Sequence, residues 1–210
     1  MKILVTAGPT REPIDSVRFI TNASSGRMGI AVANAAAAAG HEVTLLLGPV
    51  ADDAVSKNVT VVRFVTFDDL KAAAESRFGS CDVLVMAAAV GDFTVKNRTE
   101  TKISRRNGPI ELELVPTPDI LGELGRRKSC RQRIISFAVE DGGRQQAIVD
   151  KARSEMARKN ADFCVLNTPA AMAAEASMAC ILSPADFVLQ WAFRSKTELA
   201  EEIVRIFESE

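Results

Sequence analysis

The chain has 210 residues, of which 47% are hydrophobic and 25% charged, so it can bury one sizeable core and is typical of a single domain covering residues 1–210. Its 26 Lys and Arg residues against 27 Asp and Glu give a net charge of -1, which provides no electrostatic basis for binding nucleic acid or an anionic membrane surface. No apolar stretch is long enough to span a bilayer and no signal peptide precedes the first strand pattern, so we expect a cytoplasmic protein.

The four cysteines lie far apart in the sequence and form no Cys-x-x-Cys pair. We expect all of them to be small buried side chains in a reducing compartment, rather than disulfide partners or zinc ligands. They are Cys81, Cys130, Cys164 and Cys180.

Short apolar runs, typical of strands buried on both faces of a sheet, alternate with helical patterns along the chain. In chain order we expect a strand at Ile3–Val5, a helix at Met28–Ala39, strands at Val43–Leu47 and Val59–Val65, a helix at Phe67–Phe78, a strand at Val83–Met86, a helix at Pro118–Arg127, a strand at Arg133–Ala138, a helix at Arg144–Lys159, a strand at Phe163–Leu166, and a helix at Lys196–Phe207. Thr66 is the expected N-cap of the second helix, and Pro118 is expected in the first turn of the third.

Two segments depart from this alternation. The polar stretch Val90–Val115 predicts a long functional loop that ends in a short strand at Ile110–Leu114. Near the C-terminus, Met178–Leu182 and Phe187–Trp191 flank a turn and predict a hairpin. The predicted fold is therefore α/β and doubly wound, with a mostly parallel, Rossmann-like sheet, a long active-site loop and a C-terminal hairpin.

The connection between the first strand and the first helix is unusually long and ends in Ser24-Ser25-Gly26-x-x-Gly29. Glycines let a backbone approach a phosphate, and the free N–H groups of a helix N-terminus favour an anion. Arg18 and Asn22 lie just upstream and add a cation and an amide. The same residues equally fit a tight helix start capped by Ser24 or Ser25, and they match neither a dinucleotide-binding fingerprint nor a Walker A loop.

A second candidate segment, Ala87–Phe93, follows the strand at Val83–Met86. Ligands of open α/β sheets bind beyond the carboxyl ends of strands, where Asp92 is suited to Mg²⁺, a ribose or a base amine, or simply to a turn. Lys102 and Lys159 are ordinary solvated cations on their pattern alone, and His41 is a turn residue. No Ser-His-Asp, Cys-His or metal-ligand set is present, which leaves electrostatic positioning of a phosphate-bearing ligand.

Taken in order, these segments resemble the phosphopantothenoylcysteine synthetase (phosphopantothenate–cysteine ligase) family, the synthetase domain of the bacterial coenzyme A biosynthesis flavoprotein. The resemblance extends over about three quarters of the chain, through Lys159, and its Asn-x-Ser-Ser-Gly run is specific. The matching segments are A-G-P-T-R-E-P-I-D at Ala7–Asp15, V-R-F-I-T-N-A-S-S-G-R-M-G at Val17–Gly29, A-A-A-V-G-D-F at Ala87–Phe93, K-I at Lys102–Ile103, P-D-I-L at Pro118–Leu121 and F-A-V-E at Phe137–Glu140.

The resemblance implies a ligase that joins 4'-phosphopantothenate to L-cysteine. The carboxylate attacks the α-phosphate of CTP, or of ATP, with Mg²⁺ present, and an acyl-nucleotidylate and pyrophosphate form. The amine of cysteine then displaces CMP. The resemblance further implies a homodimer and, because the family is often fused to a decarboxylase, either a stand-alone synthetase with a separate phosphopantothenoylcysteine decarboxylase or an excised domain.

Site residues follow from the same resemblance. Arg18, Asn22 and Lys102 match catalytic positions: Arg18 reaches a site across the dimer interface, Asn22 handles the acyl intermediate, and Lys102 is needed to form it. The binding positions are Gly8, Ser24, Gly26 and Gly29 for the triphosphate, Ala88 and Ala89 for the acyl pocket, and Asp92, Thr117, Pro118, Asp119, Ile120, Phe137 and Lys159 for the nucleotide.

Two departures from the family pattern affect base preference and the triphosphate contacts. Thr117 stands where many bacterial members have Asn in Lys-Asn-Pro-Asp-Ile, and Glu155 stands where they have a nucleotide-contacting lysine.

Two other functional classes are alternatives to the ligase. An NAD(P)-dependent short-chain-type reductase fits the fold but needs a Tyr-x-x-x-Lys pair, and the chain contains no tyrosine. A nucleotide-binding regulatory subunit without activity would have no need of both Asn22 and Lys102.

Overall fold

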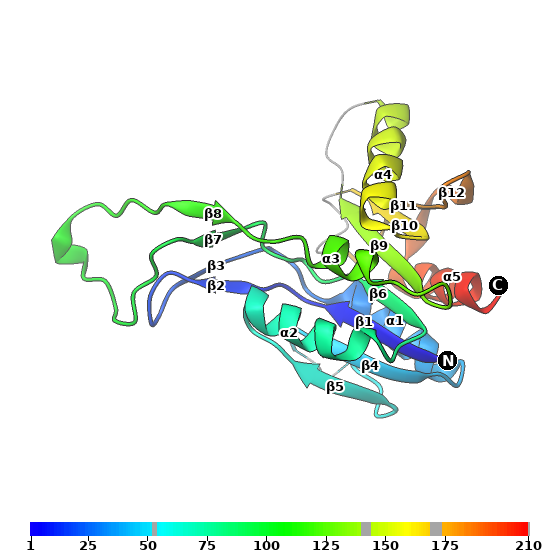
Figure 1. Cartoon of the computed structure of the whole chain (residues 1–210), viewed down its shortest axis with the longest axis horizontal. Coiled ribbons are helices and arrows are strands. Elements are labelled where there is room, and N and C mark those ends of the chain that lie inside the picture. The colour runs from blue at the N-terminus through cyan, green and yellow to red at the C-terminus, as the bar shows by residue number, and fades with distance from the viewer. Residues whose placement is uncertain (52–53, 140–143, 169–173, 210) are drawn as a thin grey trace.

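The computed structural model describes residues 1–51, 54–139, 144–168 and 174–209. Its centre is an eight-stranded sheet in the order β12-β11-β10-β9-β6-β1-β4-β5 (Figure 1). Six neighbouring strands are parallel: β1 (Lys2–Ala7), β4 (Glu42–Leu47), β5 (Val59–Arg63), β6 (Val83–Met86), β9 (Arg133–Val139) and β10 (Phe163–Asn167). The antiparallel strands β11 (Ala176–Leu182) and β12 (Phe187–Ser195) complete one edge.

Helices cover both faces of this sheet, because successive side chains of each strand point to opposite sides. In β1, Ile3 and Val5 pack with α1 (Arg27–Ala38) and α5 (Lys196–Glu208), whereas Leu4 packs on the other side. That second side is covered by α2 (Phe67–Phe78), α3 (Ile120–Arg126) and α4 (Gln145–Lys159). The doubly wound, mostly parallel fold and the C-terminal hairpin are confirmed.

Local expectations were met at α2, where Thr66 caps the helix within a capping box. Others were wrong. Helix α3 begins at Ile120 with Asp119 as its N-cap, so Pro118 precedes the helix, because the carboxylate of Asp119 accepts the free N–H of Gly122. Neither Ser24 nor Ser25 caps α1: its N-cap is Gly26, with φ 73°, a left-handed conformation that glycine adopts without strain.

The cysteine prediction holds in part. All four thiols are free, and Cys81, Cys164 and Cys180 are buried. Cys130 is exposed, because it follows α3 in a surface turn rather than lying in a strand.

An arm, formed by residues 11–21 and 93–116, projects from the body (Figure 1). It contains two antiparallel pairs of three-residue strands: β2 (Arg11–Pro13) with β3 (Phe19–Thr21), and β7 (Phe93–Val95) with β8 (Leu114–Pro116). A 3₁₀ turn, η1, lies at Arg105–Asn107. The expected strand at Ile110–Leu114 was therefore wrong in position, since pairing with β7 begins only at Leu114.

Asp15 joins the two halves of the arm. This buried carboxylate accepts hydrogen bonds from the backbone of Val17 and Arg18, each 2.8 Å, and from Ile103 N at 3.1 Å in the other half. Arg18 pairs with Asp15 at 2.9 Å and donates to the Ile103 carbonyl at 2.5 Å. Burial raises the pKa of Asp15, but the backbone donors and Arg18 outweigh it and hold the pKa below its usual value. An ionised Asp15 thus keeps the arm together.

Candidate active site

Two adjoining cavities lie beyond the carboxyl ends of the parallel strands, where open α/β sheets place their ligands. One, of about 400 Å³, lies at the N-termini of α1 and α5 and is called the α1 cavity; the other, of about 310 Å³, lies at the N-terminus of α3 and is called the α3 cavity. They share the wall residues Ala88, Val90, Asp92 and Phe137, so they form one continuous cleft.

The start of α1 is built for close backbone approach. A side chain at Gly26 would meet the backbone of Gly8 at 3.3 Å, and one at Gly29 would stand 2.5 Å from the Cβ of Ala7. Gly8 itself has φ 83°. No side chain caps α1 and no acidic residue lies in its first turn, so the N–H groups of that turn favour an anion in the cavity. Three of the predicted triphosphate positions, Ser24, Gly26 and Gly29, line the cavity. The fourth, Gly8, lies against Gly26 outside the cavity wall.

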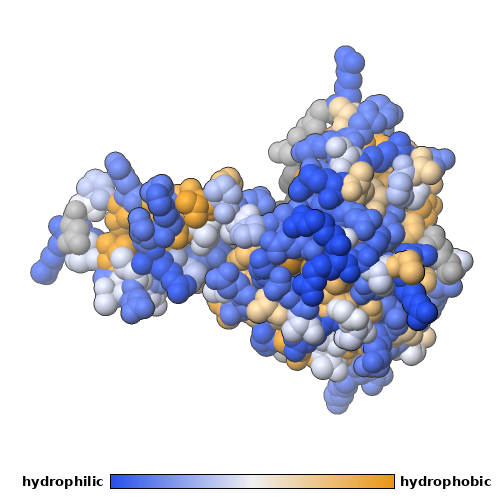
Figure 2. Space-filling model, viewed as in Figure 1, coloured by the Kyte–Doolittle hydropathy of each residue, from blue (hydrophilic) through white to orange (hydrophobic). Residues whose placement is uncertain are grey.

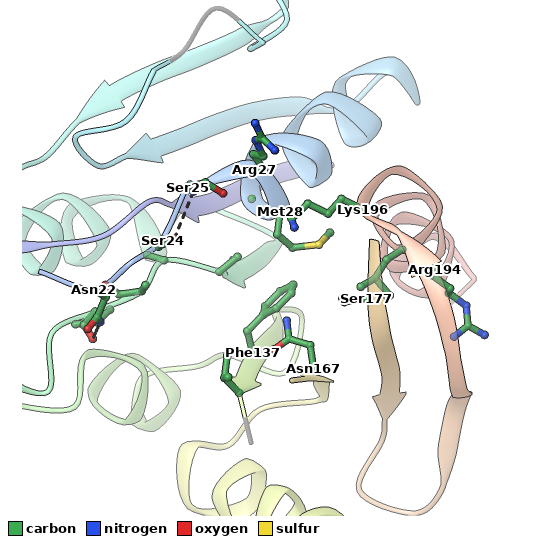
Figure 3. Close-up of a pocket in the computed structure, with 18 of the residues that line it drawn as sticks. Asn22, Ser24, Ser25, Arg27, Met28, Phe137, Asn167, Ser177, Arg194 and Lys196 are labelled. Carbon is green, nitrogen blue, oxygen red and sulfur yellow. Dashed lines mark hydrogen bonds between the residues drawn. The ribbon is translucent and has the colours of Figure 1, made fainter. Parts of the chain in front are cut away.

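Asn22 lies at one end of the α1 cavity, beside the segment that follows β6 (Figure 3). Its amide nitrogen donates to the carbonyls of Ala89 and Val90, at 3.2 and 2.9 Å. These bonds fix the orientation of the amide and join the β3–α1 connection to the end of β6. Ala88 and Ala89 line the same cavity, as expected from the sequence, and leave room beside the backbone.

The α3 cavity gathers the predicted nucleotide contacts. Thr117 donates its hydroxyl to Gly91 O at 2.6 Å, and its backbone N–H donates to Asp92 O at 2.9 Å, which joins the end of the arm to the cleft. The remaining predicted residues on its wall are Pro118, Asp119, Ile120, Phe137 and Lys159.

Asp119 is ionised where it meets two cations. Burial raises its pKa, but the hydrogen bond from Gly122 N and the charges of Lys159 and Arg158 outweigh burial and place the pKa below its usual value. The ion pair with Arg158 is 2.9 Å long.

Glu155 holds Arg158 rather than lining the cleft. Its carboxylate accepts from Arg158 Nε at 3.2 Å and Nη2 at 2.6 Å, and Lys159 lies 3.6 Å away. The hydrogen bond from Arg158 lowers the pKa of Glu155. Position 155 therefore carries a carboxylate where many family members have a lysine, and this carboxylate holds the guanidinium of Arg158, which lines the α3 cavity.

Two predicted catalytic residues lie outside the cleft of their own chain. Arg18 is in the arm, paired with Asp15, and Lys102 is an exposed arm residue next to Ile103. The structure therefore groups Asn22 with the binding residues but places Arg18 and Lys102 together elsewhere.

Sequence reasoning missed the wall that the C-terminal third supplies to the α1 cavity. Its signals were available: one residue directly follows an apolar strand pattern at the carboxyl edge of the sheet, and another begins the last predicted helix. The residues are Asn167, Ser177, Arg194, Ser195, Lys196 and Leu199. Asn167 carries a buried Oδ1 with no hydrogen-bond partner in the described part of the chain, as expected of a group that faces a ligand.

Within the described residues, no group of three or more His, Cys, Asp or Glu side chains is arranged to hold a metal ion. Asp92 lines both cavities, and one carboxylate together with substrate phosphates is a donor set that suits Mg²⁺. No helix among these residues has the length and apolar character needed to cross a membrane.

Comparison with known proteins shows the family of the chain. Residues 1–209 match the family model described as DNA/pantothenate metabolism flavoprotein, C-terminal domain. The chain is 40% identical over 208 residues to a cysteine/cysteine sulfinic acid decarboxylase of an unknown prokaryotic organism, covering 97% of this chain and 57% of that protein. It is 41% identical over 165 residues to the coenzyme A biosynthesis bifunctional protein CoaBC of Bacillus subtilis, covering 79% of this chain and 39% of that protein.

Among solved structures, the C-terminal domain of a CoaBC protein superimposes with a TM-score of 0.81 at 33% identity, covering 99% of this chain and 94% of that one. The chain spans about half the length of the curated relatives it matches. With its fold, its glycine-tight helix start and the family match over residues 1–209, the chain belongs to the DNA/pantothenate metabolism flavoprotein C-terminal domain family.

Proposed function

We propose that this chain is a phosphopantothenate–cysteine ligase that activates the carboxylate of 4'-phosphopantothenate with a nucleoside triphosphate, CTP or ATP, and transfers the acyl group to cysteine. The observation that carries the proposal is the placement of Asn22, Ala88 and Ala89 in one cavity with the uncapped N-terminus of α1. An acyl pocket beside a phosphate site is what this activation needs. The name of the CoaBC relative supports the same pathway, coenzyme A biosynthesis.

The chemistry divides between the two cavities. The α3 cavity, with Asp92, Phe137 and Thr117, takes the nucleoside, and the first turn of α1 takes the phosphates. Asn22, fixed by its two carbonyl partners, orients the acyl group for attack by the amine of cysteine. Mg²⁺, held by Asp92 and the phosphates, would neutralise phosphate charge.

A homodimer completes the site in this proposal. The arm carries six exposed apolar side chains, and Figure 2 shows hydrophobic surface on it. They are Val17, Phe19, Phe93, Ile110, Leu112 and Leu114. A patch of this kind on a projecting element favours burial against another protein. A second copy of this chain is the partner we propose, because the arm would then bring Arg18 and Lys102 to the cleft of the neighbouring chain.

We place the enzyme in the cytoplasm, upstream of a phosphopantothenoylcysteine decarboxylase on the same or a separate chain. The bifunctional CoaBC relatives, of which this chain matches less than half, support a second activity that is joined to the synthetase in some organisms. The reductase alternative finds no support in the relatives, and the phosphate-binding character of the α1 cavity favours ligation over the decarboxylation named for the first relative.

Pyrophosphate release tests the proposal. The purified chain is incubated with 4'-phosphopantothenate and each of the four triphosphates, with and without cysteine. We expect release with CTP, and the phosphopantothenoylcysteine product only when cysteine is present. A chain that releases no pyrophosphate with any triphosphate is not this ligase.

A further inference from the structure

Lys196 is the first residue of α5 and lines the α1 cavity. It is partly buried, and its side chain extends from α5 toward Met28 in the first turn of α1 (Figure 3). Its ammonium donates to the carbonyl of Ala174. The side chain therefore lies beside the same helix N-terminus that favours phosphate.

The three other charged residues on this wall are less suited to a phosphate. The guanidinium of Arg194 points away from the cavity in Figure 3 and donates to the carbonyls of Ala179 and Gln190. Arg27 forms an ion pair with Glu175, and Asp92 is anionic. Lys196 is the cation that begins α5 and extends toward the first turn of α1.

Asn22 and Lys196 lie at opposite ends of the α1 cavity, with Ser24 to Met28 between them (Figure 3). In a displacement at phosphorus the attacking oxygen and the leaving oxygen are roughly in line, on opposite sides of the phosphorus atom. If the acyl substrate lies beside Asn22, the leaving group is directed toward Lys196.

We propose that Lys196 binds the terminal phosphates of the nucleotide and stabilises the departing pyrophosphate; this inference rests on the proposed function. A carboxylate oxygen forms a bond to the α-phosphorus, and the bond from that phosphorus to the bridging oxygen of the β-phosphate breaks. The electron pair stays on the pyrophosphate, where the ammonium of Lys196 neutralises the added charge. No proton transfer is required.

Charges of both signs surround Lys196. Burial lowers the pKa of Lys196, Glu175 raises it, and the nearby charge of Arg27 lowers it. A bound polyphosphate would add negative charge beside the two cations Arg27 and Lys196, which both line the cavity.

Calorimetric titration with inorganic pyrophosphate, and separately with CMP, tests the assignment on the whole chain. Lys196→Gln removes the charge and keeps a polar side chain. We expect it to weaken pyrophosphate binding at least about tenfold, to leave CMP binding unchanged, and to lower kcat with CTP by about a hundredfold, as the loss of one electrostatic donor does. Lys196→Arg should restore part of the pyrophosphate affinity. Lys57→Gln, at an exposed position away from both cavities, is the matched control.

Equal pyrophosphate affinity in the wild type and the Lys196→Gln variant overturns the inference, as does an equal loss of pyrophosphate and CMP binding. Thermal unfolding of each variant separates a loss of binding from a loss of folding, because a variant that keeps the wild-type melting temperature is still folded. Failure of the proposed function looks different: the wild type would form no ligation product, whatever its affinity for pyrophosphate.

Discussion

Gly29 lies directly against Ala7: a Cβ at position 29 would stand 2.5 Å from the Cβ of Ala7 and 2.7 Å from the carbonyl oxygen of Thr6. Helix α1 can approach β1 this closely only with glycine there. We expect Gly29→Ala to destabilise the fold by about 1–3 kcal/mol, the usual cost of overpacking. It should also weaken nucleotide binding, because the first turn of α1 moves away from the strand. Urea denaturation and nucleotide titration measure the two effects.

Gly79→Ala is the control for this prediction. A Cβ at Gly79 meets nothing within 4 Å, and its φ of -63° suits any residue. We expect a stability change within about 1 kcal/mol, on the stabilising side, and unchanged nucleotide binding. Similar losses in the two variants would mean that the contact between Gly29 and Ala7 is not what makes position 29 sensitive.

Asp119 provides a pH-dependent prediction. Its pKa is lowered in the folded protein, so it contributes stability above the unfolded carboxyl pKa of about 4 and loses that contribution as pH falls through the folded value. Asp119→Ala removes both cap and charge and should cost about 1–2 kcal/mol at pH 7. Asp119→Asn keeps a good cap and should cost less, about 0–1 kcal/mol, since the ion pair is partly exposed.

The measurement is urea denaturation of the wild type and the Asp119→Asn variant between pH 7 and pH 3. The difference in the free energy of unfolding between the two proteins should decrease as pH falls below about 4. A difference that stays constant over this range of pH would show that the charge of Asp119 does not stabilise the fold.

Shared active sites predict complementation between inactive chains. An Arg18→Ala chain lacks the residue that the arm is proposed to bring to its neighbour, and an Asn22→Asp chain lacks the residue in its own cleft. In a mixed dimer one site has both native residues, so mixing should restore a fraction of wild-type activity. Activity of each parent alone is the baseline. If no mixing ratio exceeds the parents, the arm does not serve the neighbouring site.

Lys102 and Asn22 are predicted to act in different half-reactions. Lys102→Gln removes a charge needed while the carboxylate attacks the α-phosphate, and should slow formation of the acyl-nucleotidylate by about a hundred- to a thousandfold. Asn22→Asp places a carboxylate beside a phosphate and should stall the attack by cysteine, so that the intermediate accumulates. Rapid quench with labelled CTP follows both. Accumulation in the Lys102 variant, with none in the Asn22 variant, would reverse the two roles.

The sheet was predictable because its central strands are continuous apolar runs. Leu45, Val85 and Val165 stand in such runs, and all three are fully buried. The start of α1 was recognisable from its glycines, but its cap was not, since a serine before a helix is ordinarily the cap. Gly26 takes that place because a left-handed residue is needed where the chain passes Gly8.

The arm and the C-terminal wall escaped prediction for different reasons. Strands β2, β3, β7 and β8 have three residues each, too few to show a period of two. Lys196 was recognised as the start of a helix, yet only the return of β11 and β12 along the sheet brings it beside α1. Contacts between residues so distant in sequence leave no local pattern.

The arm also constrains the order in which the molecule assembles. Its two halves leave the sheet from β1 and β6, which are adjacent strands, and the bridge between Pro9 and Ala89 extends their pairing to the base of the arm. That long-range parallel pair brings the two halves of the arm together, and such pairings form slowly. We therefore expect a newly synthesised chain to form its core before its arm. During refolding, a protease should still cut the arm after the core has become resistant to cleavage. A variant that weakens the pairing of β1 with β6 should lengthen the time for which the arm can be cut.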